Sequence, residues 1–239
     1  FEGTAPLPDD TTYSAPVLTS FNGQAAMVFG SGDGSVAAFQ PGTGKKLWSY
    51  NASARGINVT PLVVGDKVIC GHSEENLDSR KMGAVFCLDG TKTGDITKTG
   101  VLWRHQELLI GKSSPLHVDG KIFAAEDTGT LHCFDLDTGK ILWSHDLVSE
   151  YGARQDGRGY SPSPIAYRDT VIVPAGGRDA SVMAFNQKTG AVAWKGGNFS
   201  LAPASPVLIN VDGQDQLVAY LVPVACQALN HEFGPGAVI

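Results

Sequence analysis

Residues 133–143 read CFDLDTGKILW, and close copies of this stretch recur along the chain. Residues 38–48 (AFQPGTGKKLW) and 184–194 (AFNQKTGAVAW) share its frame: a small residue, a polar residue two places later, a Thr-Gly turn and a closing Trp. Another copy is stretched, since CLD at 87–89 opens it and TGVLW at 99–103 closes it. Repetition about every 40 to 55 residues indicates a modular architecture rather than a single-core enzyme fold.

Each repeat opens with a small or hydroxyl residue before a proline. Proline is tolerated at the head of a strand because the ladder does not yet need its missing donor. An apolar run, a turn such as Asn22-Gly23 or Asp119-Gly120, and a second strand follow, and such turns suit tight hairpins. The five starts, near residues 15, 60, 114, 163 and 205, are Ala15-Pro16, Thr60-Pro61, Ser114-Pro115, Ser163-Pro164 and Ser205-Pro206.

The third repeat predicts four short antiparallel strands, with its later strands at 121–125, 130–135 and 140–145. Four-stranded units at this period are the blades of a β-propeller, and helical periodicity is absent throughout, so we expect one all-β propeller domain over residues 1–239. The four tryptophans are predicted to be structural docks between blades, with a small residue and a glycine making room for each ring. They are Trp48, Trp103, Trp143 and Trp194, and the room-making residues include Ala38, Cys133, Gly44 and Gly139.

Composition excludes several classes of protein. The 239 residues are enough for one large all-β domain, and 18 Lys plus Arg against 24 Asp plus Glu give a net charge of −6. Nucleic-acid and anionic-membrane surfaces need a basic face, so neither partner is expected. No apolar run reaches the roughly 18 residues of a transmembrane helix.

The cysteines and histidines show no metal-site spacing. Cys70, Cys87, Cys133 and Cys226 include no C-x-x-C pair, and no H-x-H or H-x-x-x-H pair occurs, so no metal site is expected. Cys87 and Cys133 occupy the alanine slot of the repeat and are predicted to be small buried thiols. A Cys70–Cys87 disulfide across a strand pair stays open as the alternative. G-x-S-x-G is missing, which removes the usual serine nucleophile.

Loops before the inner strands would, in a propeller, point at one mouth of the central channel. They span residues 55–60 (RGINVT), 111–114 (GKSS) and 154–161 (RQDGRGYS). Such a cluster could receive a carboxylate or phosphate by charge-assisted hydrogen bonds. The alternative is that its members are solvated loop residues. The candidate site consists of Arg55, Asn58, Lys112, Ser113, Arg158 and Tyr160.

The frame A-x-[DNQ]-x-x-T-G-x-x-x-W resembles the tryptophan-docking motif of the pyrroloquinoline-quinone (PQQ)-like repeat propellers. Residues 94–100 (GDITKTG), 159–164 (GYSPSP) and 171–177 (VIVPAGG) look like the BamB-like and planctomycete-type members. This superfamily holds quinone-dependent dehydrogenases as well as the non-enzymatic BamB propellers, so the motif is specific for fold and poor for function. The resemblance implies seven or eight blades, a periplasmic or extracellular location, and quinone ligands at matching channel-mouth positions in the dehydrogenases.

The chain departs from that family pattern in size. About five blades are visible, and residues 228–230 (ALN) are followed by FGPG at 233–236 rather than Thr-Gly. We therefore expect part of a seven- or eight-bladed ring. The alternative is a five-bladed ring whose last edge residues 1–12 supply, because an uncovered edge invites association. The charged insertion at 72–82 is expected to be an exposed excursion, solvated or in contact with a partner.

The functional expectation is a non-catalytic, exported scaffold that binds a protein or peptide, through strand addition for example, or a small anionic ligand. A quinone dehydrogenase needs a calcium site, a catalytic Asp and, in many members, an adjacent Cys-Cys pair, and no such pair or acidic cluster occurs. Asp33 and Asp127 are explained by hairpin turns. We expect no cofactor and no catalytic residue. The alternatives are a PQQ-dependent dehydrogenase, with PQQ and Ca²⁺, and an extracytoplasmic sensor domain.

Overall fold

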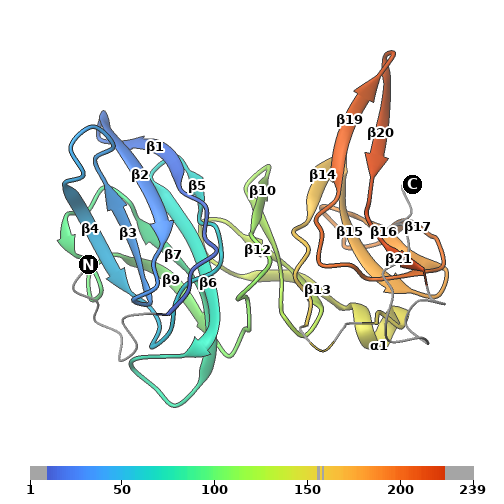
Figure 1. Cartoon of the computed structure of the whole chain (residues 1–239), viewed down its shortest axis with the longest axis horizontal. Helices are drawn as coiled ribbons and strands as arrows, with labels where there is room; N and C mark the ends of the chain where they lie inside the picture. Colours follow the sequence, from blue (N-terminus) through green and yellow to red (C-terminus); the bar gives the residue numbers. More distant parts are fainter. Residues whose placement is uncertain (1–9, 155–156, 158, 224–239) are drawn as a thin grey trace. The chain divides into compact units, whose positions relative to one another are not determined.

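The computed structural model describes residues 10–154, 157 and 159–223, and nearly all of its regular structure is β-strand (Figure 1). The chain divides into two compact units: Phe1–His117 with Leu136–Lys140, and Val118–Asp135 with Ile141–Ile239. Each of four sheets contains four neighbouring strands that follow one another along the chain. In one of these sheets the short strand β8 intervenes in the sequence and joins another sheet instead. This confirms the predicted all-β class and its four-stranded units.

The first unit contains two of these sheets. In the first sheet the order is β1-β2-β3-β4-β8, and in the second it is β5-β6-β7-β9. The strands of the first sheet are β1 (Val17–Phe21), β2 (Gln24–Gly30), β3 (Ser35–Phe39), β4 (Lys46–Asn51) and β8 (Gly94–Asp95). Those of the second are β5 (Leu62–Val64), β6 (Lys67–Glu75), β7 (Met82–Asp89) and β9 (Val101–Gln106).

The third and fourth sheets repeat the same meander. The strands of the third are β10 (Leu116–Val118), β11 (Lys121–Ala125), β12 (Thr130–Asp135) and β13 (Ile141–Asp146). The fourth contains β14 (Ile165–Tyr167), β15 (Thr170–Gly177), β16 (Ala180–Asn186) and β17 (Val192–Gly196). The described part of the fifth repeat forms two strand pairs: β19 (Val207–Val211) with β20 (Gln214–Val218), and β18 (Phe199–Ser200) with β21 (Val222–Pro223).

One short helix occurs within the all-β fold. Between β13 and β14 lies a five-residue helix, α1 (Leu147–Tyr151). Asp146 caps its start, since its carboxylate accepts hydrogen bonds from the amides of Val148 and Ser149, and Gly152 ends it in the left-handed conformation. A helix of five residues is too short to show an apolar period of 3.6 residues, so the sequence pattern does not predict it.

The predicted two-residue hairpins have the backbone that their sequences require. Asn22-Gly23 has φ values of 50° and 76°, Asp119-Gly120 has 46° and 73°, and Asp212-Gly213 has 51° and 79°. Two consecutive positive φ values characterise the type I′ turn, whose twist matches that of the flanking strands. The turns therefore determine the strand register around them.

The repeated sequence frame corresponds to one cross-strand arrangement. In every four-stranded meander the small residue lies directly opposite the tryptophan of the next strand, and the register shifts immediately after it. The pairs are Ala38 with Trp48, Cys87 with Trp103, Cys133 with Trp143, and Ala184 with Trp194. A small side chain at this position leaves room for the large ring beside it.

Three tryptophans also contact the repeat that follows. The indole Nε1 of Trp48 donates to the carbonyl of Gly90, that of Trp103 to Leu136 and that of Trp143 to Gln187, at 2.9, 2.9 and 3.3 Å. Each acceptor lies three residues after the small residue of its own repeat. Trp48 and Trp103 are buried and Trp143 is partly buried. The fourth ring, Trp194, is 43% exposed, so its predicted burial is not seen.

Three of the hydroxyl residues that precede a proline, Thr60, Ser114 and Ser205, have a structural role as well. The Ala15 amide donates to Thr60 Oγ1, the Thr60 amide to Ser114 Oγ and the Ser163 amide to Ser205 Oγ, at 3.0, 3.2 and 2.8 Å. Each bond joins equivalent positions of consecutive repeats. The hydroxyl thus satisfies a backbone donor of the preceding repeat.

The described cysteines are free, and the Cys70–Cys87 disulfide does not form. Cys70 lies opposite Phe86 and Cys87 lies opposite Ile69, so the two side chains point to opposite faces of the sheet. Cys87 and Cys133 are fully buried, as predicted. Burial raises the pKa of Cys70, Cys87 and Cys133 to about 12, so these thiols stay protonated at neutral pH. Cys226 lies outside the described residues.

Candidate functional site

The residues predicted to line a channel mouth lie in different surroundings. Arg55 is half-exposed, with its Nε 3.8 Å from Oε2 of Glu75. Lys112 is exposed, whereas Ser113 is fully buried and its Oγ has no hydrogen-bond partner among the described residues. These residues and Asn58 belong to the first unit. Their convergence on one ligand stays a prediction.

Two of the predicted residues make clear structural contacts instead. Asn58 Oδ1 accepts a hydrogen bond from the Tyr13 amide at 3.1 Å, beside the bond between Gly56 N and Asp10 Oδ2 at 3.0 Å. Tyr160, in the second unit, is fully buried, and its hydroxyl donates to the Pro174 carbonyl at 2.9 Å. Both side chains are therefore explained by packing. Arg158 lies outside the described residues.

The predicted charged excursion at 72–82 is much shorter in the structure. Strand β6 continues to Glu75 and β7 begins at Met82, so only residues 76–81 form the connecting loop. His72, expected to be exposed, is buried within β6. The residues are polar, yet the sheet includes them because their backbone continues the ladder from β6 to β7.

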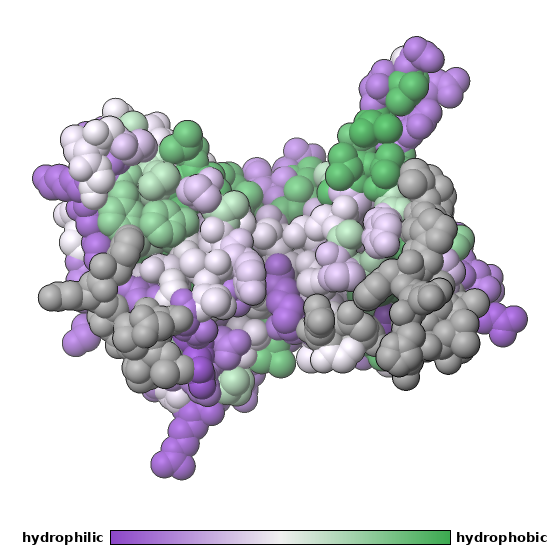
Figure 2. Space-filling model, in the orientation of Figure 1, coloured by the Kyte–Doolittle hydropathy of each residue, from purple (hydrophilic) through white to green (hydrophobic). Residues whose placement is uncertain are grey.

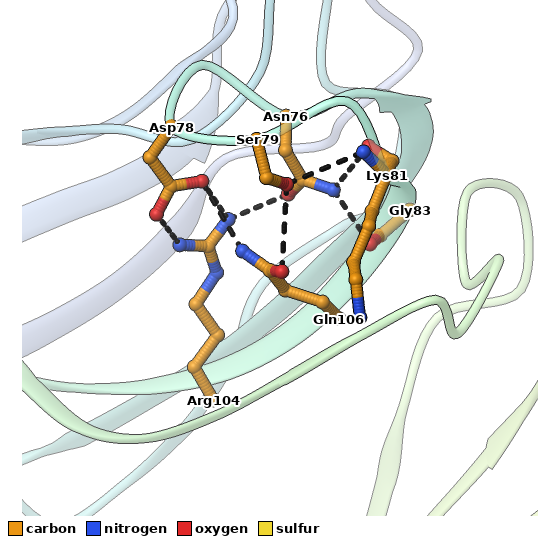
Figure 3. A network of polar contacts seen from close by, with 7 residues as sticks. All are labelled: Asn76, Asp78, Ser79, Lys81, Gly83, Arg104 and Gln106. Atoms are coloured by element: carbon orange, nitrogen blue, oxygen red, sulfur yellow. Dashed lines mark hydrogen bonds and ion pairs between the residues drawn. The ribbon is translucent and has the colours of Figure 1, made fainter.

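A polar network holds this loop against strand β9 (Figure 3). Arg104 of β9 reaches up with its guanidinium and binds both carboxylate oxygens of Asp78, at 2.6 and 3.1 Å. The same group donates to Oδ1 of Asn76 at 2.5 Å. Hydrogen bonding to Arg104 lowers the pKa of Asp78 below its usual value. A bidentate arginine–carboxylate pair fixes direction as well as distance, so it orients the loop.

Asn76 and Gln106 complete the network (Figure 3). Nδ2 of Asn76 donates to the carbonyls of Lys81 and Gly83, at 2.7 and 3.0 Å, which closes the loop across its base. Gln106 Nε2 donates to Asp78 at 3.2 Å. Lys81 Nζ lies 2.6 Å from a carboxylate oxygen of Glu107. The loop is thus ordered by hydrogen bonds from its ends and from β9.

This pre-ordered loop presents apolar side chains to solvent. Leu77 is 47% exposed and Met82, at the start of β7, is 43% exposed. Arg80 between them is exposed too. A loop whose backbone is already ordered loses little further backbone entropy when a partner covers its apolar side chains. We call residues 76–81, together with Met82 at the start of β7, the β6–β7 loop and treat it as the candidate functional site.

His72 lies beneath this site with neither ring nitrogen hydrogen-bonded among the described residues. Its ring centroid is 6.4 Å from that of Phe86. Burial, together with the positive charge of Arg104, lowers the pKa of His72 from 6.5 to about 4. The imidazole is therefore neutral at neutral pH.

A Ser-His-Glu hydrogen-bond chain joins strands β12 and β13 to the turn between β11 and β12. His132 Nδ1 lies 2.7 Å from Ser144 Oγ, and His132 Nε2 lies 2.8 Å from Glu126 Oε1. His132 and Ser144 are direct cross-strand partners, so the sheet register places them together. The chain satisfies the buried imidazole and the buried carboxylate, which is a sufficient structural reason for it.

The fifth repeat presents a second exposed apolar surface. Val207, Ile209 and Val211 alternate along β19 and are 55%, 41% and 43% exposed. Figure 2 shows this hydrophobic surface along the hairpin β19–β20. The residues that follow in this repeat, from 224 on, lie outside the described part of the chain, so the β6–β7 loop is the better-defined surface.

Within the described ranges, no three His, Cys, Asp or Glu side chains are grouped to hold a metal ion. No helix in the same ranges combines the length and the apolar character needed to cross a bilayer.

Comparison with known proteins identifies relatives of the whole described region. The model of the family described as outer membrane protein assembly factor BamB matches residues 10–100 and 94–223. The chain is 27% identical over 190 residues to BamB of Burkholderia pseudomallei (strain K96243), and 24% identical over 144 residues to BamB of Moranella endobia (strain PCIT). These alignments cover 77% and 58% of the chain but only 44% and 35% of the relatives' own lengths.

Among solved structures, the chain is similar to a europium-containing methanol dehydrogenase. The TM-score is 0.58 at 12% identity, over 90% of this chain and 47% of the dehydrogenase. At this identity the likeness shows the fold alone, which is that of a β-propeller. The predicted architecture of four-stranded blades is confirmed by this likeness and by the sheets of the chain.

Proposed function

Since the chain belongs to the BamB family of PQQ-like repeat propellers, we propose that it is a non-catalytic scaffold that binds a protein partner in outer membrane protein assembly. Its curated relatives are named as outer membrane protein assembly factors. The chain spans less than half of the length of these relatives. A role that a relative performs as a whole protein is therefore proposed for this chain, not established for it. We propose a periplasmic or extracellular location on the same basis.

The observation that carries the proposal is the β6–β7 loop. It displays Leu77 on a segment that hydrogen bonds to Arg104 hold in place, and Met82 is exposed beside it at the start of β7. Binding energy is highest where an apolar anchor is rigid before contact, because little ordering remains to be done. The loop therefore supports protein binding better than it supports catalysis.

Site-specific photo-crosslinking in the host tests this proposal. A photoreactive residue replaces Leu77 in the intact protein, and the matched control replaces Leu18, which is 72% exposed on β1. We expect adducts with components of the outer membrane assembly machinery at position 77 and none at position 18. Adducts at neither position, or equally at both, would argue against the loop as the binding surface.

A double substitution provides the quantitative arm. Leu77→Ser with Met82→Ser removes both apolar anchors without touching the Arg104 network. We expect the affinity for the crosslinked partner to fall by about tenfold or more, since each buried apolar side chain contributes roughly 1.5 kcal/mol or more. Equal affinity in the variant would refute the role of these side chains. Unchanged thermal unfolding serves as the control for folding.

The dehydrogenase alternative is tested separately. The protein is incubated with PQQ and Ca²⁺, and its absorbance and dye-linked alcohol oxidation are measured. We propose that no cofactor binds, so neither tight quinone uptake nor turnover is expected. Turnover that depends on PQQ would establish an enzyme and overturn the scaffold proposal. A sensor domain is distinguished by signalling output that responds to a ligand.

A further inference from the structure

A small cavity opens in the second unit beside the turn between β15 and β16. Its volume is about 190 Å³, and two arginines line it, Arg154 before β14 and Arg178 in the turn itself. Asn198 and Ser200, from the segment that follows β17, line the same cavity. Three separate stretches of chain thus bring hydrogen-bond donors to one hollow.

Two glycines of the cavity lining allow neighbouring segments to approach closely. A Cβ at Gly176 would lie 2.4 Å from the Leu201 amide nitrogen, and a Cβ at Gly177 would lie 2.3 Å from the Tyr151 carbonyl oxygen. Both glycines line the cavity. Any larger residue would push these segments apart, so the close approach that shapes the hollow requires glycine at both positions.

The segment on the opposite side is held by a buried serine. Ser181 Oγ accepts a hydrogen bond from the Phe199 amide at 2.6 Å and donates to the Phe199 carbonyl at 3.0 Å. Ser181 itself is fully buried in β16. Asn198, Phe199 and Ser200 are therefore anchored to the sheet, and the cavity is formed before any ligand arrives.

The donors in this cavity match an anion. Its lining includes two arginines and no Asp or Glu. Ser200 is fully buried, yet its Oγ has no hydrogen-bond partner among the described residues. A buried hydroxyl without a partner costs free energy, and an anionic oxygen bound in the cavity would accept a hydrogen bond from it. The guanidinium groups offer paired N–H donors that fit carboxylate and phosphate oxygens.

Size restricts the ligand further. Pockets for drug-sized molecules are roughly 300 to 1,000 Å³, so a cavity of about 190 Å³ accommodates a small group rather than a whole quinone cofactor. We propose that this cavity binds a small oxyanion, phosphate or carboxylate, held by Arg154 and Arg178 and completed by Ser200. The site is distinct from the β6–β7 loop, and the proposal is independent of the scaffold function.

Calorimetric titration of the intact protein with inorganic phosphate tests the site. We expect saturable binding with one phosphate per chain. Arg154→Gln and Arg178→Gln should each weaken it by about tenfold, because each removes a charge-assisted contact. The matched control is Arg80→Gln, an exposed arginine of the first unit, which should leave the affinity unchanged.

Ser200→Ala separates a built site from general charge attraction. It removes no charge, so weaker phosphate binding in this variant identifies a specific hydrogen bond. Titration with acetate and with glycerol phosphate then shows whether a carboxylate or a phosphate monoester fits better, and binding of either class supports the proposal. Failure of all three anions to bind, or equal affinities in Arg80→Gln and Arg178→Gln, would overturn it.

Discussion

Gly139 shows at the scale of one residue why the Thr-Gly turn recurs. It has a φ of 70°, and a Cβ there would lie 2.6 Å from Cδ2 of Trp103. The turn thus serves two purposes, since it reverses the chain and leaves room for the ring of the preceding repeat. Gly190 has the same relation to Trp143, at 2.9 Å. A motif in the sequence predicts the turn, but the contact with another repeat appears only in the structure.

Gly139→Ala and Gly44→Ala form a matched pair of substitutions. Both glycines have a φ of 70°, but no described atom lies within 4 Å of a Cβ at Gly44. Gly44→Ala should cost about 1 kcal/mol of unfolding free energy for backbone strain. Gly139→Ala should cost about 1 to 3 kcal/mol more, because it also displaces Trp103. Urea denaturation measures both, and equal losses would contradict the docking role of Gly139.

His72 makes stability depend on pH. Its pKa is about 4 in the folded protein and 6.5 when unperturbed, so the unfolded chain binds the proton more readily. The free energy of unfolding should therefore decrease as the pH falls from 6.5 to 4, by at most about 3 kcal/mol. His72→Leu should flatten this part of the curve of stability against pH. If the variant kept the same dependence of stability on pH, groups other than His72 would be the cause of that dependence.

At the scale of elements, the strands and hairpins follow from local sequence, whereas the added pieces do not. Strand β8 lies parallel to β4, with Gly94 opposite Trp48, although it belongs to the insertion of the second repeat. Periodicity could not predict this pairing, because two residues carry no alternation and the partner lies far away in sequence. The sequence shows the stretched copy of the repeat, but it does not show that part of this copy forms the fifth strand of the first sheet.

The Arg104 network is an element-scale device that can be loosened. Arg104→Lys keeps the charge but cannot form the paired bonds to Asp78, so the β6–β7 loop should open more often. The backbone amide of Asn76 donates to the Lys81 carbonyl at 3.2 Å. We expect this backbone amide to exchange its hydrogen about tenfold faster in the variant. Arg80→Lys on the same loop is the control. Unchanged exchange in Arg104→Lys would show that the loop does not depend on this pair.

At the scale of the whole molecule, the described cysteines report on the fold. Cys70, Cys87 and Cys133 are buried, free and protonated at neutral pH. Iodoacetamide should leave all three unmodified in the native protein and alkylate all three in urea without a reductant. Peptide mass spectrometry reads both states. A Cys70–Cys87 disulfide would instead appear as an unmodified, linked pair in urea.

The sequence by itself determined the repeat, its hairpins, its buried small residues and the family, because each depends on local backbone preference or on a spacing within one repeat. It did not determine the Arg104 network, the cavity of about 190 Å³ or the contacts of the hydroxyls before proline. Those arise where segments from different strands or repeats meet, and their residues have no fixed spacing along the chain. Only the packing of one segment against another could bring Arg154, Arg178 and Ser200 to one cavity.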